Sequence, residues 1–474
     1  MFRWPCVLWV AFLALGAEGF IVASSTSEAP RVRRRSGPSN SSDGGVIAAA
    51  WYAGWHATDF PLSQVSWAKY SIMTYAFAVP TADPSVISLD PSDKTLLPKF
   101  VAAAHQHNVS ASLSIGGWAG SRFFSTSVGS PNNRTAFVKA IVDLAKQYKL
   151  DGIDFDWEYP GRQGIGCNVV SANDTTNFLS FLQQLRQDPT GSNLVLSAAT
   201  AVTPFLDASG HPSSDVSAFA SVLDHISIMN YDIWSFWSSG VGPNAPLNDT
   251  CAGSSNRNGS AVSAVQAWTN AGIPSHQIVL GVPAYGHSFA VEPSNAFASG
   301  STTELNSFPS FNASAQPVGD RWDGAPGVDL CGAQQGQGGV FTFWGLIEEG
   351  FLNPDGSVAS GIASRFDECS QTPYVYNQSR QTMVSYDNAQ SFTAKGNLVR
   401  ALNLGGFAVW EAGGDSGDIL LDAIRTAIAS NSSSPFTSSS SPNSSSNSAI
   451  SSGIMNRMQT SIIAMFLSLV LWSC

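Results

Sequence analysis

The feature that most constrains the fold is a regular alternation of short apolar segments with amphipathic ones, which begins near Val46. Apolar runs of this length, bounded by glycine and polar residues, are typical of buried parallel strands. The segments between them have helical periodicity. For example, residues 134–149 place Phe137, Ile141 and Leu144 on one stripe. The pattern predicts an α/β fold in which strands and helices alternate along the chain.

Eight strands are expected, and eight strands with intervening helices form a closed (β/α)8 TIM barrel. The predicted strands are residues 47–52, 71–77, 110–115, 151–160, 194–201, 225–232, 278–286 and 405–411. The interval between the last two is far longer than a barrel loop. Its glycine- and aromatic-rich sequence predicts a small β-rich insertion over about residues 288–385, between strand 7 and helix 7.

The fourth predicted strand carries an unusual set of acidic side chains. Successive side chains of a strand point to opposite faces, so Asp154, Asp156 and Glu158 share one face. The apolar Ile153 and Phe155 share the other. Burial and like-charge repulsion both favour the protonated acid, so at least one carboxyl pKa is expected to be raised. A protonated carboxyl beside an ionised one suits general acid catalysis at a glycosidic bond.

Two other interpretations of this segment are weaker. A calcium-binding loop needs glycine at its sixth position and an acid at its twelfth, where this chain has Tyr159 and Ile165. A solvated acidic face would not alternate with Ile, Phe and Trp. We therefore interpret the segment as catalytic.

Polar and aromatic residues also gather at the carboxyl ends of other predicted strands, where barrel enzymes place their active sites. These residues are Tyr52, Met229, Asn230, Tyr231, Asp232, Tyr285 and Trp410. A capped loop would explain Tyr231 and Asp232, and core packing would explain Trp410. Their common place at one barrel mouth favours a site, because a Trp ring can stack on the apolar face of a sugar.

The segment Asp151–Glu158 resembles the signature D-G-x-D-x-D-W-E of family 18 glycoside hydrolases, the chitinases and their relatives. Further segments resemble other motifs of that family: Ser114–Gly117, Met229–Asp232, Gly281–Gly286 and Gly405–Glu411. The likeness covers roughly residues 46–428, and His287 stands where many relatives carry Arg. It implies that the insertion is the α+β domain of the family's bacterial-type branch.

The resemblance implies substrate-assisted hydrolysis of chitin without a metal or other cofactor. Glu158 would be the general acid, and Asp154 and Asp156 would support it. Tyr231 would contact the acetamido group of the substrate. Substrate-binding roles are expected for Tyr52, Phe77, Gly117, Trp118, Tyr159, Met229, Asp232, Tyr285 and Trp410. The leading expectation is an endo-acting chitinase that binds chitin or chito-oligosaccharides. An endo-β-N-acetylglucosaminidase and a chitin-binding, lectin-like protein remain as alternatives.

Composition narrows the partners. With 43% hydrophobic and 12% charged residues, the chain is typical of a globular protein. Its net charge of −11 argues against a nucleic-acid partner, because phosphate-binding surfaces need an excess of Lys and Arg. A neutral polysaccharide fits this charge better, and a monomer is expected.

Both ends are predicted to be processing signals. Residues 1–19 are typical of a secretory signal peptide, and residues 20–45 of a linker or pro-segment with a basic cluster at Arg31–Arg35. Residues 431–449 form a Ser-rich stalk, and residues 450–474 match a GPI-attachment signal. Residues 46–430 would then be the catalytic domain. With the resemblance, these signals suggest a fungal, GPI-anchored enzyme at the cell surface or in the cell wall.

The cysteines agree with secretion. Cys167, Cys251, Cys331 and Cys369 would remain after processing, an even number in an oxidising compartment. Three pairings are possible, and we favour Cys331 with Cys369 and Cys167 with Cys251. Because these cysteines have no CxxC spacing and no His partners, no zinc site is expected. Sequons such as that at Asn173 also fit a secreted protein.

Overall fold

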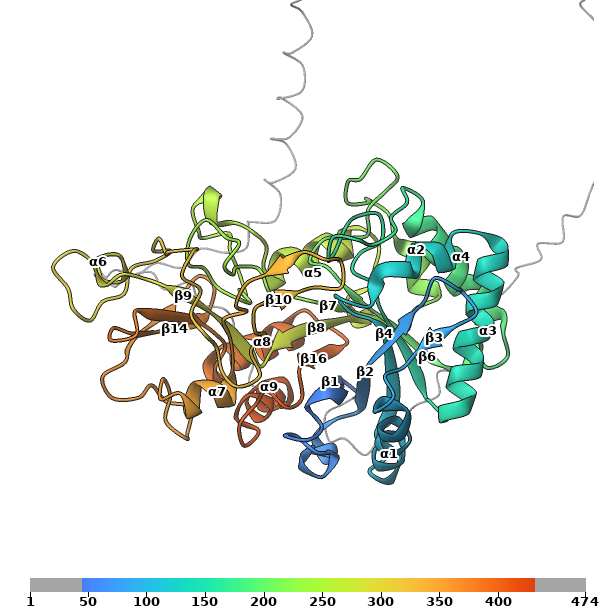
Figure 1. The fold of residues 1–474 in the computed structure, drawn as a ribbon, viewed down its shortest axis with the longest axis horizontal. Coiled ribbons are helices and arrows are strands. Elements are labelled where there is room, and N and C mark those ends of the chain that lie inside the picture. The colour runs from blue at the N-terminus through green and yellow to red at the C-terminus, as the bar shows by residue number, and fades with distance from the viewer. Residues whose placement is uncertain (1–44, 431–474) are drawn as a thin grey trace, which may run out of the picture. The chain divides into compact units, whose positions relative to one another are not determined.

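The computed structural model describes residues 45–430, which form a closed barrel of parallel strands with an insertion on one side (Figure 1). The barrel strands are β1 (Ile47–Ala53), β2 (Ile72–Pro80), β4 (Ser110–Gly116), β5 (Gly152–Asp156), β6 (Val195–Thr200), β7 (His225–Ile228), β8 (Ile278–Pro283) and β16 (Gly406–Trp410). Their order is β1-β16-β8-β7-β6-β5-β4-β2, and pairing of β1 with β2 closes the ring. The predicted TIM barrel is confirmed.

Helices surround the barrel: α1 (Asp93–Gln106), α2 (Phe124–Val128), α3 (Pro131–Tyr148), α4 (Asp174–Gln187), α5 (Ala261–Asn270), α8 (Ala389–Ala401) and α9 (Ile419–Ala429). Their ends follow local rules. The Ser130 side chain accepts the N–H of Asn133 at the start of α3, and Asn388 and Ser391 form a capping box on α8. Among the residues that the structure describes, no helix combines the length and apolar character needed to span a membrane.

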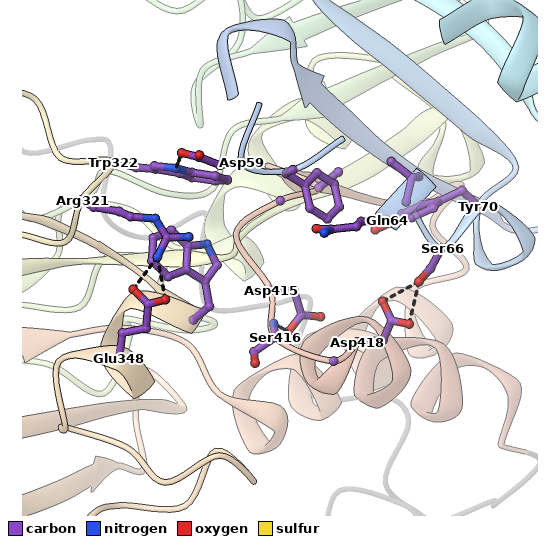
Figure 2. Close-up of a pocket in the computed structure, with 16 residues that line it drawn as sticks. Asp59, Gln64, Ser66, Tyr70, Arg321, Trp322, Glu348, Asp415, Ser416 and Asp418 are labelled. Atoms are coloured by element: carbon purple, nitrogen blue, oxygen red, sulfur yellow. Dashed lines mark hydrogen bonds and ion pairs between the residues drawn. The ribbon is translucent and has the colours of Figure 1, made fainter. Parts of the chain in front are cut away.

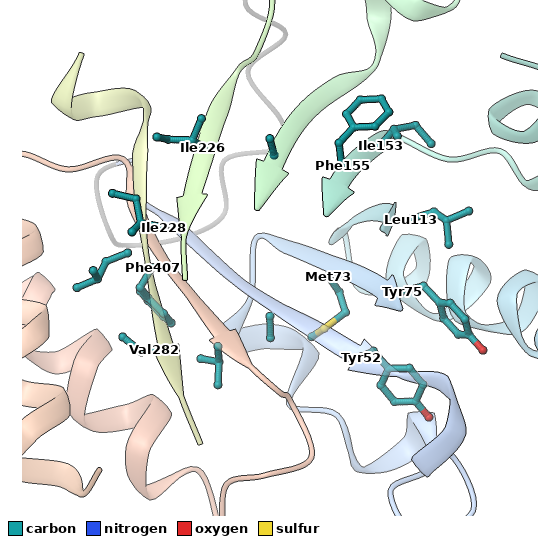
Figure 3. Close-up of a cluster of buried hydrophobic side chains, with 14 of the residues drawn as sticks. Tyr52, Met73, Tyr75, Leu113, Ile153, Phe155, Ile226, Ile228, Val282 and Phe407 are labelled. Atoms are coloured by element: carbon teal, nitrogen blue, oxygen red, sulfur yellow. The ribbon is translucent and has the colours of Figure 1, made fainter. Parts of the chain in front are cut away.

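The barrel residues divide into two layers. Outward-facing side chains form a large apolar core against the helices, and Figure 3 shows part of it, including Tyr52, Leu113 and Phe155. Inward-facing residues are mostly small and form a separate cluster that includes Ala49, Trp51, Ala76, Ala199, Val279 and Ala408. The small inner side chains leave the barrel mouth to longer polar and aromatic ones.

Three predicted strands end three or four residues earlier in the structure than expected. The fourth ends at Asp156, the sixth at Ile228 and the seventh at Pro283. The residues beyond these ends belong to the loops of the mouth. Tyr285, predicted as the end of the seventh strand, instead begins the first strand of the insertion.

The insertion lies between β8 and α8, as predicted, and is built around an antiparallel sheet of order β12-β9-β15-β14-β13. Its strands are β9 (Tyr285–Ala290), β12 (Val340–Thr342), β13 (Ala363–Asp367), β14 (Thr372–Asn377) and β15 (Thr382–Ser385). Two short helices, α6 (Pro293–Ala296) and α7 (Phe343–Glu348), complete an α+β unit. Two two-residue strands, β10 (Gly327–Val328) and β11 (Gln334–Gln335), form a separate hairpin. In the barrel sheet, β3 (Ile87–Ser88) pairs antiparallel with the end of β2.

The favoured disulfide pairing is wrong. The structure pairs Cys167 with Cys331 and Cys251 with Cys369. Cys167 and Cys251 lie on loops that follow different barrel strands, β5 and β7, and each meets a different loop of the insertion. Both bonds therefore join the barrel to the insertion, whereas the favoured pairing would have placed one bond within each.

Candidate active site

Three carboxyl groups lie at the carboxyl end of β5, although the strand does not reach the last of them. Ile153 and Phe155 point outward into the apolar core, as alternation requires, and Asp154 points into the barrel. Glu158 lies two residues beyond the strand end and is still buried. Two side chains hold its backbone: Ser121 Oγ accepts its N–H over 2.9 Å, and Asn168 Nδ2 donates to its carbonyl over 2.8 Å.

Asp154 is fixed by three donors from three other strands. Oδ2 accepts from Trp51 Nε1 on β1 at 3.1 Å and from Ser114 Oγ on β4 at 2.8 Å. Oδ1 accepts from Ser197 Oγ on β6 at 2.6 Å. Sequence analysis missed Trp51 and Ser197, whose contacts depend on the closure of the barrel. The three bonds hold the innermost carboxyl of the row in one orientation.

The environment raises the pKa of the other two carboxyls, those of Asp156 and Glu158. Burial raises the pKa of Glu158 to about 7, and the negative charge of Asp232 adds to this effect. Burial raises the pKa of Asp156 as well, followed by repulsion from Glu158 and Asp154. Asp156 Oδ1 is buried and has no hydrogen-bond partner among the residues that the structure describes. The pair thus offers a proton donor near neutral pH and one polar atom free to receive a ligand.

A second polar group stands at the end of β7 and the start of β9. Burial, followed by the charges of Asp156 and Asp232, raises the pKa of Tyr231, so its hydroxyl keeps its proton and can donate. Asp232 Oδ1 accepts from the Tyr285 hydroxyl and contacts His287 Nε2, each at 2.7 Å. Tyr231 and Asp232 of the barrel loops and Tyr285 and His287 of the insertion therefore form one wall of the mouth together.

Asn244 and Ser235, which the sequence did not single out, support this wall. Asn244 Oδ1 accepts the N–H of Asp232, and its Nδ2 donates to the carbonyl of Tyr285. Ser235 Oγ lies 3.1 Å from His287 Nδ1. These contacts join residues of the loop after β7 to β9. They could not be predicted from residue spacing in the sequence.

Aromatic rings line the mouth between these groups. Phe77 stacks on Trp55 and Trp410, with ring centroids 5.9 and 5.6 Å apart. Trp55, Trp118 and Trp237 are each more than half exposed, which is unusual for tryptophan. Rings of this kind can stack on the apolar faces of sugars. Trp55 lies in a 3-10 turn, Gly54–His56, directly after β1, and Trp237 lies in the loop after β7; neither was predicted.

Other predicted residues support the mouth rather than line it. Gly117 has φ of +80°, and a Cβ there would lie 2.9 Å from the Phe77 ring, so only glycine allows this approach. Met229 is half-buried against the inner cluster. Tyr159 lies beside Glu158, and the Arg162 guanidinium stacks on its ring at 4.1 Å.

The prediction for Tyr52 is wrong. This side chain is only 1% exposed and packs outside the barrel against Phe60, Tyr75 and Phe100. Its hydroxyl donates to the carbonyl of Phe60 over 2.9 Å. Neighbouring residues of a strand face opposite sides, so the inward position belongs to Trp51.

A separate cavity of about 390 Å³ lies beside the mouth (Figure 2). Arg321 and Trp322 of the insertion lie on one side, Ser66 and Tyr70 on the other, and Asp415 between them. None of the predicted site residues is among those that line it. It marks the place where the insertion meets the loops that follow β1 and β16.

Comparison with known proteins agrees with this geometry. The family model "Glycosyl hydrolases family 18" matches residues 48–415. The chain belongs to glycosyl hydrolase family 18. A "chitinase-like effector" of Moniliophthora roreri is 53% identical to this family 18 member over 382 residues, which cover 81% of this chain and 93% of the relative. "Chitinase A1" of Niallia circulans is 27% identical over 335 residues, 69% of this chain and 44% of the relative.

Solved structures agree as well. The crystal structure of a chitinase from Rhizomucor miehei matches this family 18 member with a TM-score of 0.72 and 33% sequence identity. The match covers 80% of this chain and 99% of that one. The shared fold therefore extends over almost all of the described residues.

Proposed function

We propose that the protein is an endo-acting chitinase that hydrolyses β-1,4-linked N-acetylglucosamine polymers with retention of configuration. The observation that carries the proposal is Glu158, a buried acid with a pKa of about 7, beside Asp156 with its unpartnered inward oxygen. An acid that holds its proton near neutral pH can protonate a glycosidic oxygen. The names of the chitinase relatives support the substrate.

The mechanism is proposed to be substrate-assisted. Glu158 donates its proton to the leaving oxygen while the carbonyl oxygen of the substrate's own acetamido group attacks C1, which breaks the glycosidic bond and forms an oxazolinium ring. Asp156 accepts the acetamido N–H, and Tyr231 donates to the carbonyl oxygen. Water then attacks C1, Glu158 takes its proton, and the ring opens with retention. An ordinary retaining enzyme instead uses a second carboxylate about 5 Å from the acid as the nucleophile. Asp156 lies beside Glu158 on the same side of the barrel and does not face it across the sugar, so we do not assign it the role of nucleophile.

Two other functions remain to be tested against this one. The first is that the protein binds chitin without hydrolysing it, which is suggested by the name of the 53% identical relative, a chitinase-like effector. The presence of Glu158 supports catalysis instead. An endo-β-N-acetylglucosaminidase would use the same residues on N-glycans. The insertion supports a polymer cleft, and we also assign the chain to the bacterial-type branch on that basis.

The test compares the wild type with Glu158→Gln on chitin hexamer and on a high-mannose glycopeptide, with products separated by chromatography. Wild type is expected to shorten the hexamer and leave the glycopeptide intact. The variant should lose hydrolysis by roughly 10²–10⁴-fold or more, because the amide cannot donate the proton, and still bind hexamer. Cleavage of the glycopeptide alone would establish the endo-β-N-acetylglucosaminidase. Binding of hexamer without hydrolysis by wild type would establish a lectin.

We also propose that the mature protein is a monomer on the outer cell surface, held by a GPI anchor. The segments predicted as signal peptide, linker, stalk and GPI signal (residues 1–19, 20–45, 431–449 and 450–474) lie outside the described residues, apart from residue 45. Two disulfides in the described part support an oxidising compartment. Phosphatidylinositol-specific phospholipase C should release the protein from intact cells, and light scattering should give the monomer mass. Retention on membranes with residues 450–474 intact would refute the anchor.

A further inference from the structure

Residues 324–338 of the insertion, here called the strap, form a hairpin that packs on no core. It contains β10 and β11, and all four residues of these strands are exposed. Val328 is 62% exposed. An isolated two-stranded hairpin is at best marginally stable in water. The strap must therefore be held at its ends.

The base of the strap is closed by one carboxylate. Asp323 accepts the backbone N–H groups of Gly339 and Val340, at 2.9 and 3.0 Å. The N–H of Gly338 donates to the carbonyl of Gly324 over 2.9 Å. These bonds bring the two ends of the strap together.

Trp322, immediately before this base, docks on the rim of the barrel. Its ring stacks on His56 with centroids 3.8 Å apart. Its Nε1 donates to Asp59 Oδ2 over 2.9 Å (Figure 2). Both partners follow β1. A Cβ on Gly413, which follows β16, would lie 2.9 Å from the Trp322 ring. The strap therefore starts above the ends of β1 and β16.

The tip of the strap is fixed at the opposite side. Asp329 Oδ1 accepts the N–H of Cys331 and shapes the turn, and Cys331 is bonded to Cys167 with Cα atoms 5.6 Å apart. Cys167 lies in the loop after β5. Its neighbour Asn168 holds the carbonyl of Glu158. The tip is thus bonded to the loop that holds the backbone of Glu158.

In the closed order of the barrel, β5 is the strand opposite β16. A hairpin with its base at β16 and its tip at β5 crosses the barrel mouth, and exposure of both its strands is what a crossing requires. We propose that the strap encloses a saccharide strand bound over Glu158, so that the strand is threaded in by a free end, is cleaved at an internal bond and leaves along its own axis. The proposal rests on the proposed function and adds a specificity-determining element, the Cys167–Cys331 bond. A strand that extends on both sides of the strap should dissociate slowly, and a disaccharide should not.

The test measures dissociation of chitin dimer and hexamer from the full-length Glu158→Gln protein, with and without Cys167→Ser/Cys331→Ser. Opening the strap is expected to speed hexamer dissociation roughly tenfold or more, since enclosure acts on the dissociation rate, and to leave the dimer unchanged. The matched control is Cys251→Ser/Cys369→Ser, which removes the other bond between barrel and insertion and should change neither rate. Equal acceleration for both oligomers would mean that the bond only positions the Glu158 loop, and no acceleration would mean no enclosure. Either result overturns the proposal.

A second measurement needs no cysteine variant. Hexamer blocked at both ends with bulky protein caps should bind the intact-strap protein far more slowly than hexamer capped at one end. Equal binding of the two would overturn enclosure. If neither uncapped oligomer binds the intact-strap protein, the proposed function fails, and the strap proposal fails with it.

Discussion

The hydroxyl of Tyr285 donates a hydrogen bond of 2.7 Å to Oδ1 of Asp232, which joins the first strand of the insertion to the loop after β7. His287 Nε2 contacts the same oxygen at the same distance. Asp232 is thereby held where its negative charge acts on Glu158. Through these two contacts the insertion helps to set the electrostatics of Glu158.

Replacing Asp232 should move the alkaline limit of activity. In the proposed mechanism Glu158 must be protonated to act, and its pKa is raised to about 7, first by burial and then by the Asp232 charge. Activity of the wild type should therefore fall as the pH rises through about 7. Asp232→Asn removes the repulsion, lowers the pKa of Glu158 and shifts that limb to lower pH. The pH profile of kcat/KM reports the pKa of the free enzyme, and an unshifted limb would contradict the assignment.

Adjacent aromatic residues of β1 provide a matched pair. Trp51→Phe removes a donor to Asp154, and a hydrogen bond to a charged group contributes about 1.5–3 kcal/mol, so kcat should fall by roughly tenfold or more. Tyr52→Phe removes only the bond to Phe60 and should lower the free energy of unfolding by about 1 kcal/mol with unchanged kinetics. Steady-state kinetics and urea unfolding measure both effects. A kinetic defect in Tyr52→Phe would return that residue to the site.

Substrate assistance predicts strong inhibition by the thiazoline analogue of N-acetylglucosamine oligomers, which resembles the cyclic intermediate. Ligands of this kind commonly bind roughly 10²-fold or more tighter than substrate. Asp156→Asn should weaken the inhibition by removing the charge that faces the ring. Tyr231→Phe should weaken it by one hydrogen bond, about 0.5–1.5 kcal/mol. Inhibition constants measure this, and a sugar adduct trapped on any carboxylate would replace the mechanism.

Glu411 should make stability depend on pH. Burial raises its pKa from 4.5 to about 7, so folding favours the protonated form. The stability gained from that proton is complete below about pH 4.5 and is lost as the pH rises toward 7. Glu411→Gln has no such proton, so its free energy of unfolding should fall less across this window, by roughly 2–3 kcal/mol. Urea unfolding at both ends of the window tests this; parallel curves for the two proteins would contradict it.

The barrel and the acidic row were predictable because both depend on local pattern. No knowledge of tertiary contacts is needed to recognise the apolar runs, the helical stripes or the alternation around Asp154. The inner face of β1 was not predictable from its own sequence, since Trp51 and Tyr52 are both large aromatic residues and either register is plausible. Only pairing with the neighbouring strands decides which of them meets Asp154.

Contacts between loops could not be predicted from the sequence for a different reason. The disulfides, the bond between Asp232 and His287, and the stacking of Trp55 on Phe77 each join segments that the barrel brings together. Spacing along the chain carries no information on which loops meet. The predicted strands were too long for another reason. The residues of the mouth continue the alternating pattern after the backbone hydrogen bonds of the strand have ended.

The position of β16 has a consequence for synthesis of the chain. This strand pairs with both β1 and β8, yet it follows the whole insertion in the sequence. Until Gly406–Trp410 leaves the ribosome, a nascent chain has two unpaired sheet edges, and such edges invite pairing with other chains. One edge of β1, the first barrel strand to be synthesised, therefore stays unpaired until β16, the last one, is available. Chaperone demand during translation should therefore last until the final barrel strand has emerged.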